Sequence, residues 1–343
     1  MKYTAVLVAG DGIGPEVAHA AREILAAAKA PIDWVDCLAG VAALEAGGKD
    51  LLPIATIEAI RKHGVALKGP CTTPVGGGFS SVNVAMRKTL DLYGAVRPVR
   101  SLNGVQTRFD NVDIVVVREN TEGLYAGIEN EITSGVVTSL KVATRVACLR
   151  IAEFAFRYAV HRNRKKVSVF HKANIMKLSD GMFIKCAREV HESKFPSIEY
   201  EELIIDAACM RLVQDPTRFD VLLMENLYGD VISDLCAGLV GGLGVVPGAN
   251  LGEHCAIFEA VHGSAPDIAG KGVANPLAIT MSAVMMLNYI AEKNSDTSLA
   301  AIATRIRTAY DRALVDGCKT RDLGGKLNTK EFATAVIDRL EPL

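Results

Sequence analysis

Three aspartates in the sequence are placed where they would suit a divalent cation. Asp230 and Asp234 lie four residues apart in ENLYGDVISDLCAGL, a spacing that puts both carboxylates on one face of a helix. Like charges at that spacing repel, so a divalent ion or a basic side chain is expected between them. Asp206 ends the apolar run in EELIIDAA. Such oxygens suit Mg²⁺ or Mn²⁺, and the alternatives are a helix-surface charge for Asp234 and a helix cap for Asp206.

Arginines near strand ends form a second group. Arg87 follows Ser81 and Asn83 at helical spacing in SSVNVAMRKTLD, Arg97 is expected in a Val-Arg-Pro turn, and Arg118 ends the run VDIVVVR. Guanidinium groups form paired hydrogen bonds with carboxylates, so this group suits a substrate with several carboxylates. A surface ion pair is the alternative for each arginine. Arg118 is the strongest candidate, because a charge that terminates an apolar strand needs a partner.

The segment HKANIMKLSDG, directly after the strand-like VSVF, offers a candidate base. Lys172 at the mouth of a strand is a candidate for partial desolvation, which would tune its pKa for proton transfer; a surface lysine is the alternative. Tyr125, after the turn ENTEG, is a candidate proton donor, although an aromatic side chain at a sheet edge more often contributes packing. His171 is as consistent with a hydrogen-bonded core position as with catalysis.

Two glycine-rich segments bear on nucleotide binding. VAGDGIGPE stands between a strand and a helix, where a dinucleotide fingerprint would be found, but the third glycine, Gly14, comes one place early and Pro15 occupies its position. The spacing favours a plain tight turn. EAVHGSAPDIAGKGVANP reads as a long ordered loop that can approach a flat ligand. Asp267 in it would accept hydrogen bonds from a ribose and repel a 2′-phosphate; a structural loop is the alternative.

The elements that position these residues alternate between strands and helices, which indicates an α/β fold. Short β-rich runs at 4–9, 112–117, 167–171, 198–205 and 219–224 are expected to be strands buried on both faces. An apolar stripe after Pro15 predicts a helix over 15–29. The segment 127–140, with a glycine between β-branched runs, is expected to form an antiparallel arm or clasp.

Composition bounds the class of protein. The 343 residues suggest about two domains, and 50% hydrophobic with 22% charged residues is ordinary globular composition. With 38 basic and 39 acidic residues, the net charge of -1 predicts neither nucleic acid nor an anionic membrane as partner. No apolar stretch reaches the roughly 20 residues of a membrane span. The eight cysteines include no CxxC pair, and scattered thiols with no visible leader predict a cytoplasmic location, or the mitochondrial matrix if a transit peptide has been removed.

Together the blocks GDGIGPE, RKTLDLYGAVRPV, VVVRENTEGLYAGIE, HKANIMKLSDGMF, NLYGDVISDLCAGLVGGLG and VHGSAPDIAGKGVANP resemble the isocitrate and isopropylmalate dehydrogenase family of β-decarboxylating dehydrogenases. The match covers essentially the whole chain. Within the family, the chain resembles above all the NAD-dependent isocitrate dehydrogenase branch. The resemblance implies an isopropylmalate-dehydrogenase-like two-domain α/β fold with a shared sheet and a dimer clasp, not a classical Rossmann fold. Residues 1–95 and 242–343 would form the large coenzyme-binding domain, and 96–241 the small domain, with the clasp at about 127–140.

The resemblance also implies an activity, namely NAD-dependent oxidative decarboxylation of isocitrate to 2-oxoglutarate and CO₂ with Mg²⁺ or Mn²⁺. It assigns Tyr125 and Lys172 as the acid/base pair, and Asp206, Asp230 and Asp234 as metal ligands. The substrate-binding residues would be Ser81, Asn83, Arg87, Arg97 and Arg118. The coenzyme-binding residues would be Ile13, Asn174, His262, Gly263, Asp267, Ile268 and Asn275. At least a homodimer is expected, because Asp206, Lys172 and Asn174 would reach the site of the partner subunit.

Coenzyme and substrate can be argued further within this resemblance. NADP-dependent members of the family carry Lys and Tyr at the positions of Asp267 and Ile268, and a Tyr and an Arg at those of Arg321 and Gly325, so NAD is expected here. Isopropylmalate enzymes carry an apolar patch in place of the Ser and Asn of the SxN segment. Homoisocitrate dehydrogenase, 3-isopropylmalate dehydrogenase and a non-catalytic regulatory subunit remain as alternatives. The presence of the acid/base pair and of all three aspartates favours a catalytic chain.

Overall fold

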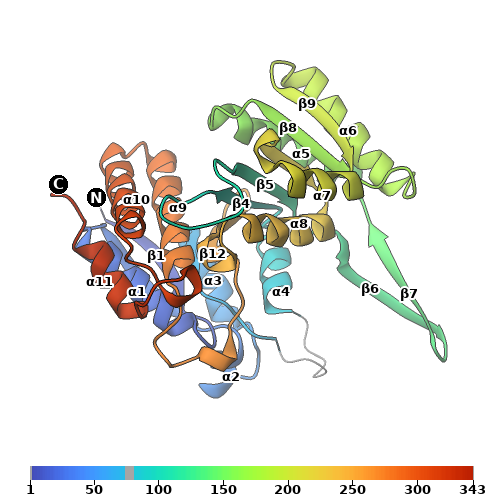
Figure 1. Cartoon of the computed structure of the whole chain (residues 1–343). Coiled ribbons are helices and arrows are strands. Elements are labelled where there is room, and N and C mark those ends of the chain that lie inside the picture. Colours follow the sequence, from blue (N-terminus) through green and yellow to red (C-terminus); the bar gives the residue numbers. More distant parts are fainter. Residues whose placement is uncertain (1, 74–80, 343) are drawn as a thin grey trace.

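The computed structural model describes residues 2–73 and 81–342, and its central feature is one large mixed sheet flanked by helices (Figure 1). The strands are β1 (Tyr3–Val8), β2 (Ile32–Cys37), β3 (Val65–Lys68), β4 (Gly94–Arg100), β5 (Asp113–Glu119), β6 (Gly123–Thr133), β7 (Val136–Val142), β8 (Lys166–His171), β9 (Glu199–Ile204), β10 (Val221–Met224), β11 (Pro247–Leu251) and β12 (Ala256–Ala260). The α-helices are α1 (Gly14–Ala27), α2 (Val41–Glu45), α3 (Ile54–His63), α4 (Val82–Thr89), α5 (Arg145–His161), α6 (Ser179–Lys194), α7 (Ile205–Gln214), α8 (Asn226–Leu239), α9 (Leu277–Asn294), α10 (Thr297–Val315) and α11 (Thr329–Ile337). Short 3₁₀ turns are η1 (Pro216–Arg218), η2 (Leu243–Val245), η3 (Pro266–Ile268) and η4 (Arg321–Leu323).

The sheet has ten strands in the order β2-β1-β3-β12-β11-β4-β5-β10-β8-β9. Neighbours are parallel except at the centre, where β11 runs antiparallel to both β12 and β4, and β4 runs antiparallel to β5. A classical dinucleotide-binding sheet is mostly parallel with a different strand order, so the predicted α/β fold without a Rossmann arrangement is confirmed. The central antiparallel strands β4, β11 and β12 are the ones that carry the candidate site.

The five predicted strands and the helix over 15–29 are present as β1, β5, β8, β9, β10 and α1, with ends shifted by a few residues. The expectation that all five strands are buried on both faces is wrong for β9. Its residues are mostly half-buried or exposed because β9 is the last strand of the sheet and pairs only with β8. Three of its six residues are Glu199, Glu201 and Glu202, and charged residues of this kind are typical of an edge strand.

The tight turn between β1 and α1 is confirmed, and its glycines are required by close approach of other chain segments. Gly10 and Gly12 have φ of 77° and 61°, a region that favours glycine. A Cβ on Gly10 would lie 2.1 Å from the carbonyl oxygen of Pro70, and one on Gly12 would lie 2.0 Å from that of Ser264. The turn therefore fixes the segment after β3 and the loop after β12 against α1.

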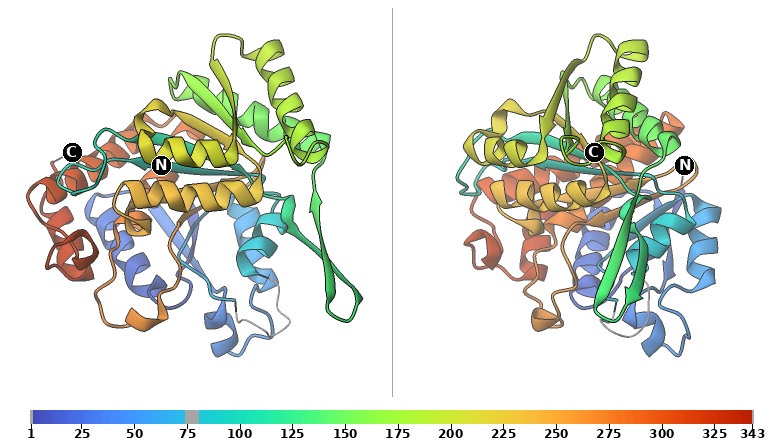
Figure 2. Two further views of the ribbon diagram at one scale, coloured as in Figure 1. Left: turned by 45° about the vertical axis from the view of Figure 1, so that its right-hand side comes forward. Right: turned by 90° about the vertical axis from the view of Figure 1, so that its right-hand side faces the viewer.

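The predicted antiparallel arm is the hairpin β6–β7, which begins four residues earlier and ends two residues later than expected. It projects from the body of the molecule in Figure 1 and in the left view of Figure 2. Several apolar side chains on it are exposed, namely Ile128, Ile132, Val136, Val137 and Leu140. The role of this hairpin as a clasp between subunits stays a prediction. The domain boundaries expected from the sequence also stay predictions. None of the helices in the described part of the chain is long and apolar enough to cross a bilayer.

Candidate active site

A pocket of about 320 Å³ lies between α4, α8 and the central strands, and it gathers residues from distant parts of the chain. The sequence-predicted residues that line it are Ser81, Asn83, Arg87, Arg97, Tyr125, Asp230, Asp234, His262 and Gly263. Ser81 and Asn83 come from the start of α4, where the Ser81 hydroxyl caps the helix by accepting a hydrogen bond from the amide of Val84. The helix α8 presents both aspartates to the same space.

Arg118, at the end of β5, is the most deeply buried charge of the site, with a side chain 1% exposed. Its guanidinium donates to the side-chain oxygen of Asn226 at 3.0 and 2.6 Å and to one carboxylate oxygen of Asp230. The other oxygen of Asp230 accepts a hydrogen bond from the hydroxyl of Tyr125, whose ring lies 5.0 Å from the Arg118 guanidinium carbon. The partner that the sequence required for Arg118 is thus the first turn of α8.

The prediction of a turn at Arg97 is wrong, because β4 continues through Pro98 to Arg100 and pairs with β5 along its whole length. β11 pairs with β4 only at residues 94–96, so the proline lies where β4 has a single neighbouring strand and the missing N–H is tolerated. Arg97 itself lies 3.6 Å from Asp230 and 3.7 Å from Asp234. It is the basic side chain expected between the two like charges.

These contacts set the protonation of the site. Burial, with Arg97 and Arg87 nearby, lowers the pKa of Arg118 to about 10. Burial alone would raise the pKa of Asp230, but Arg118, Tyr125 and Arg97 outweigh it and hold that pKa below its ordinary value. Burial, together with the charge of Asp230, raises the pKa of Asp234. The pocket therefore holds an ionised carboxylate at Asp230, flanked by the guanidinium groups of Arg118 and Arg97.

A buried network behind the pocket was missed by the sequence-based predictions. Glu259 of β12 pairs with Lys68 of β3 at 2.6 Å and with Arg87 at 3.1 Å, and it accepts a hydrogen bond from the amide of Asn250 at 2.6 Å. The available signal was a charged residue within each of the apolar strands VALK and AIFEA, the same reason that singled out Arg118. The network fixes the direction of the Arg87 guanidinium.

Three buried polar atoms of residues that line the pocket have no hydrogen-bond partner among the described residues. They are the amide oxygen of Asn83, Nε of Arg87 and Nε2 of His262. Buried polar groups are normally satisfied, so unpartnered ones around a pocket point to a polar ligand that completes them. Burial lowers the pKa of His262, which favours the neutral imidazole.

A second pocket of about 370 Å³ adjoins the first at His262, which lines both. Four predicted coenzyme residues line it, namely Ile13, His262, Ile268 and Asn275, together with Arg321 and Asp322. Asp322 was not predicted; it accepts a hydrogen bond from the Asn275 amide at 2.9 Å. Asp267 lies in η3, is exposed and is not part of the lining, so its contact with a coenzyme stays a prediction.

Lys172, Asn174 and Asp206 do not line either pocket of their own chain. Lys172 follows β8 and its ammonium group lies 2.5 Å from Asp206 in the first turn of α7. That contact lowers the pKa of Asp206, a side chain open to solvent. Across residues 2–73 and 81–342 no three His, Cys, Asp or Glu side chains come close enough to hold a metal ion, so Asp206 does not join Asp230 and Asp234 within one chain.

Comparisons with known proteins relate the chain to one family of enzymes. Residues 4–336 match the family model described as isocitrate/isopropylmalate dehydrogenase. The chain is 50% identical over 339 residues to a mitochondrial catalytic subunit of NAD-dependent isocitrate dehydrogenase from Arabidopsis thaliana, covering 98% of this chain and 88% of the relative. It is 51% identical over 305 residues to a chloroplastic 3-isopropylmalate dehydrogenase from Solanum tuberosum, covering 87% of this chain and 85% of the relative.

Among solved structures, an isocitrate dehydrogenase from Methylococcus capsulatus superimposes with a TM-score of 0.93 at 46% sequence identity. The match covers 98% of this chain and 99% of the other. At this identity and coverage the relationship extends through all the elements that line the two pockets.

Proposed function

Because the chain belongs to the isocitrate/isopropylmalate dehydrogenase family, we propose that it catalyses the NAD⁺-dependent oxidative decarboxylation of isocitrate to 2-oxoglutarate and CO₂. One observation carries the choice of substrate. Arg87, Arg97 and Asp230, which is bound to Arg118, line one small pocket, and among the described residues the buried Nε of Arg87 has no hydrogen-bond partner. A buried guanidinium with a free donor is suited to a carboxylate. A tricarboxylic acid supplies several.

The start of α4 supports isocitrate over 3-isopropylmalate. These substrates differ in one group, a carboxymethyl group in the first and an isopropyl group in the second. Ser81 and Asn83 line the pocket there, and the Asn83 amide has an unpartnered buried oxygen. An apolar group at this position would leave the buried Asn83 oxygen unpaired, at a cost of about 1–3 kcal/mol. The Solanum tuberosum relative keeps 3-isopropylmalate as the second candidate.

A divalent cation fits the donor set of α8. Asp230 and Asp234 supply carboxylate oxygens at the pocket wall, and Mg²⁺ or Mn²⁺ commonly takes one or two protein carboxylates and completes its shell with substrate and water. When bound, the ion would polarise the hydroxyl oxygen and adjacent carboxylate of the substrate. Asp206 of a second copy would complete the ligands. Arg97, now between the two carboxylates, would then turn to a substrate carboxylate.

Proton transfers fall to Lys172 and Tyr125 in this proposal. Lys172, supplied by the neighbouring subunit, accepts the hydroxyl proton as the carbon is oxidised. Tyr125 gives a proton to the carbon that loses CO₂. Burial and the hydrogen bond to Asp230 raise the pKa of Tyr125, so the phenol keeps its proton at neutral pH and is available as a donor. Its hydroxyl already lies at the carboxylate that would face the substrate.

The adjoining pocket is proposed to hold the nicotinamide coenzyme, which accepts hydride from the substrate. Its contact with the substrate pocket at His262 supports the short separation that hydride transfer needs. NAD⁺ is proposed over NADP⁺ because Asp322 lines the pocket and Asp267 stands in the adjacent loop, and both would repel a 2′-phosphate. Since Asp267 is exposed, solvent screens its share of that repulsion, and Arg321 opposes it.

The proposal includes assembly into at least a dimer, as a homodimer or within a heteromer. Exposed apolar side chains of α7, α8 and the hairpin support it, among them Met210, Val213, Val231, Ile132 and Val137. Exposed apolar surface on that scale commonly marks a protein interface. The mitochondrial name of the Arabidopsis thaliana relative supports the matrix as location over the cytoplasm first expected.

The experiment that tests the function compares kcat/KM for isocitrate, homoisocitrate and 3-isopropylmalate, each with NAD⁺ and NADP⁺ and with and without Mg²⁺. The highest value is expected for isocitrate with NAD⁺, and chelation of divalent ions should abolish it. A higher value for 3-isopropylmalate would replace the substrate assignment. A pure chain that binds isocitrate without any turnover would support the regulatory-subunit alternative.

A further inference from the structure

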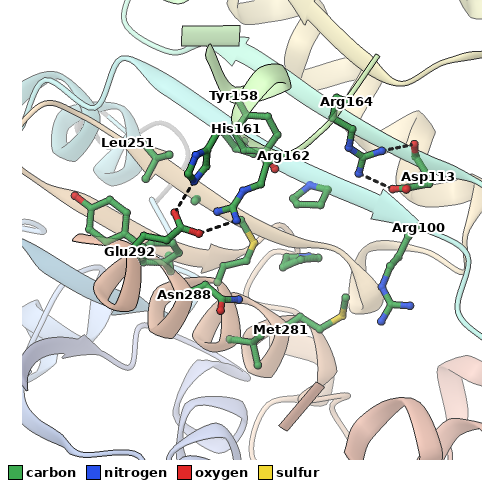
Figure 3. Close-up of a pocket in the computed structure, with 18 of the residues that line it drawn as sticks. Arg100, Asp113, Tyr158, His161, Arg162, Arg164, Leu251, Met281, Asn288 and Glu292 are labelled. Atoms are coloured by element: carbon green, nitrogen blue, oxygen red, sulfur yellow. Dashed lines mark hydrogen bonds and ion pairs between the residues drawn. The ribbon is translucent and has the colours of Figure 1, made fainter. Parts of the chain in front are cut away.

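A cavity of about 920 Å³, larger than either pocket described above, lies on the opposite side of the central strands. Figure 3 shows it between the end of α5, with the loop that follows, and the helix α9. Its wall also includes residues of β4, β11 and β12 and two side chains of α10. None of the residues assigned above to substrate, metal or coenzyme lines it.

The cavity and the candidate active site share the same strands but use opposite faces of them. Side chains alternate between the two faces of a strand. On β4, Pro98 lines the cavity while Arg97 lines the substrate pocket, and on β12, Phe258 lines the cavity while Glu259 lines the substrate pocket. One layer of sheet therefore separates the two spaces.

The space arises where the sheet loses a strand pairing. β11 pairs with β4 from Leu251↔Gly94 to Ala249↔Val96 and no further. Beyond this point Pro98 and Arg100 of β4 have β5 on one side only. The cavity lies beside this unpaired stretch of β4, and the end of α5 and the helices α9 and α10 close around it.

The interior of the cavity is apolar and aromatic. The aliphatic and thioether side chains in its lining are Val96, Leu251, Met281, Val284 and Met285, and the aromatic ones are Phe154, Tyr158, Phe258, Tyr289 and Tyr310. Neither the Tyr158 hydroxyl nor the Asn288 amide makes a side-chain hydrogen bond to another residue within the described ranges, although both face the cavity (Figure 3). An apolar interior with a few free polar groups is the usual composition of a small-molecule site.

The rim carries more positive than negative charge. Its cations are Arg100, Arg157, Arg162, Arg164, Lys165 and Arg307, and its carboxylates are Asp113, Asp220 and Glu292. Figure 3 shows Arg162 paired with Glu292, at 2.7 Å, and Arg164 paired with Asp113, at 2.7 Å. Arg157 and the ammonium group of Lys165 form no ion pair with the described residues. Arg100 and Arg307 pair with Asp311 outside the lining, so the excess of positive charge comes from Arg157 and Lys165, and it favours an anionic ligand.

We propose that this cavity is a second ligand site, which binds a small organic anion with an aromatic or branched apolar body. The apolar body occupies the interior above Phe258 and Met285, and the anionic group meets the cations of the rim. The site is separate from the reaction proposed above, since apart from Ala249 of β11 its lining residues belong to neither pocket of the active site.

The probe that tests it is 8-anilinonaphthalene-1-sulfonate, an aromatic sulfonate whose fluorescence rises in apolar surroundings. Its affinity for the assembled protein is measured by titration in saturating NAD⁺, so that the coenzyme pocket is filled. N-phenyl-1-naphthylamine, which has the same rings and no sulfonate, is measured in parallel. We expect saturable binding of the sulfonate that NAD⁺ does not displace, and at least tenfold weaker binding of the neutral compound.

Two variants locate the probe. R157E/K165E reverses two exposed rim charges and should weaken sulfonate binding at least tenfold. K62E/K330E makes the same change of charge at exposed lysines outside the cavity and should leave it unchanged. Asn288→Trp places an indole in the cavity and should weaken the binding of both probes. If Asn288→Trp does not fold, the comparison of R157E/K165E with its control decides the question.

Three results would overturn the proposal. They are displacement of the sulfonate by NAD⁺, equal affinity of the rim variant and its control, and equal affinity for the charged and the neutral probe. The first would place the probe in the coenzyme pocket, the second would place it elsewhere on the surface, and the third would remove the preference for an anion.

Discussion

The carboxylate of Asp180 accepts a hydrogen bond from the backbone amide of Lys172 at 2.7 Å. Asp180 lies in the first turn of α6 and is 2% exposed. Its other oxygen accepts a hydrogen bond at 2.5 Å from Lys141, at the end of the hairpin strand β7. The Lys141 ammonium in turn lies 4.7 Å from the ring centre of Tyr228 on α8. One buried carboxylate thus ties the segment of Lys172 to the hairpin and to the helix of Asp230.

Asp180→Asn should therefore lower kcat by about tenfold, the equivalent of about 1.4 kcal/mol, because the position of Lys172 is less firmly fixed. KM for isocitrate should change little, since the arginines of the pocket are untouched. Initial rates of NADH formation measure both. Asp316→Asn, which alters an exposed pair with Arg339, is the control. A rise in KM at unchanged kcat would show that Asp180 does not act through Lys172.

Gly229→Ala should disturb substrate binding from inside α8. A Cβ at this position would lie 2.4 Å from Cγ of Arg118, so the arginine has to move away from Asp230 and Asn226. We expect KM for isocitrate to rise at least tenfold and stability to fall by roughly 1–3 kcal/mol, as in other overpacked sites. Gly238→Ala on the same helix meets no atom within 4 Å in this chain and should be harmless. Equal kinetics of the two variants would contradict the argument.

Lys172→Met should abolish turnover while isocitrate still binds. The side chain is not part of the pocket of its own chain, so substrate binding by Arg87 and Arg97 should persist. Calorimetry measures binding and NADH formation measures turnover. Lys177→Met, at an exposed lysine of the same segment, is the control. Turnover equal to that of the wild type would remove Lys172 from the mechanism.

Glu259→Gln should destabilise the fold by roughly 3–5 kcal/mol at neutral pH, because it leaves Lys68 buried without its carboxylate. Burial would raise the pKa of Glu259, but Lys68 and Arg87 outweigh it and hold that pKa below the ordinary 4.5. A depressed pKa contributes stability that is complete above 4.5 and is lost as pH falls towards the folded-state value. The difference between wild type and variant should accordingly shrink in acid.

Urea unfolding at pH 7 and at pH 4 measures this difference. The double variant Lys68→Met/Glu259→Gln should recover part of the loss at pH 7, since Lys68 is then no longer a buried charge without a partner and only Arg87 has lost its carboxylate. Glu253→Gln, at an exposed position, is the control. A difference that grows in acid would mean that Glu259 is not the ionised partner of Lys68.

The parts of the site that the sequence predicts well are those set by local spacing or by a single buried charge. Four-residue spacing placed Asp230 and Asp234 on one helix face, and like-charge repulsion required the cation that Arg97 supplies. The apolar strand before Arg118 required a partner, although nothing local identified it as the start of α8. The alternation of strands and helices likewise follows from residues close together along the chain.

Features that depend on long-range neighbours were not predictable in the same way. Glu259 meets Lys68 and Arg87 from positions far along the chain, and only the order of strands brings them together. The edge position of β9 follows from that order as well, since its sequence does not say that only one strand pairs with it. The exposure of a loop residue such as Asp267 depends on the segments that pack around the loop, and the spacing of residues along the sequence does not determine that packing.

The separation of Lys172 and Asp206 from the pocket that holds Asp230 has a consequence for mixed assemblies. If each catalytic centre draws on two subunits, a chain with Lys172→Met and a chain with Asp230→Asn are defective in different halves of it. Each alone would be inert. Co-expressed, they would form hybrids in which one centre carries both lesions and the other carries neither, so intragenic complementation should restore activity that neither parent possesses.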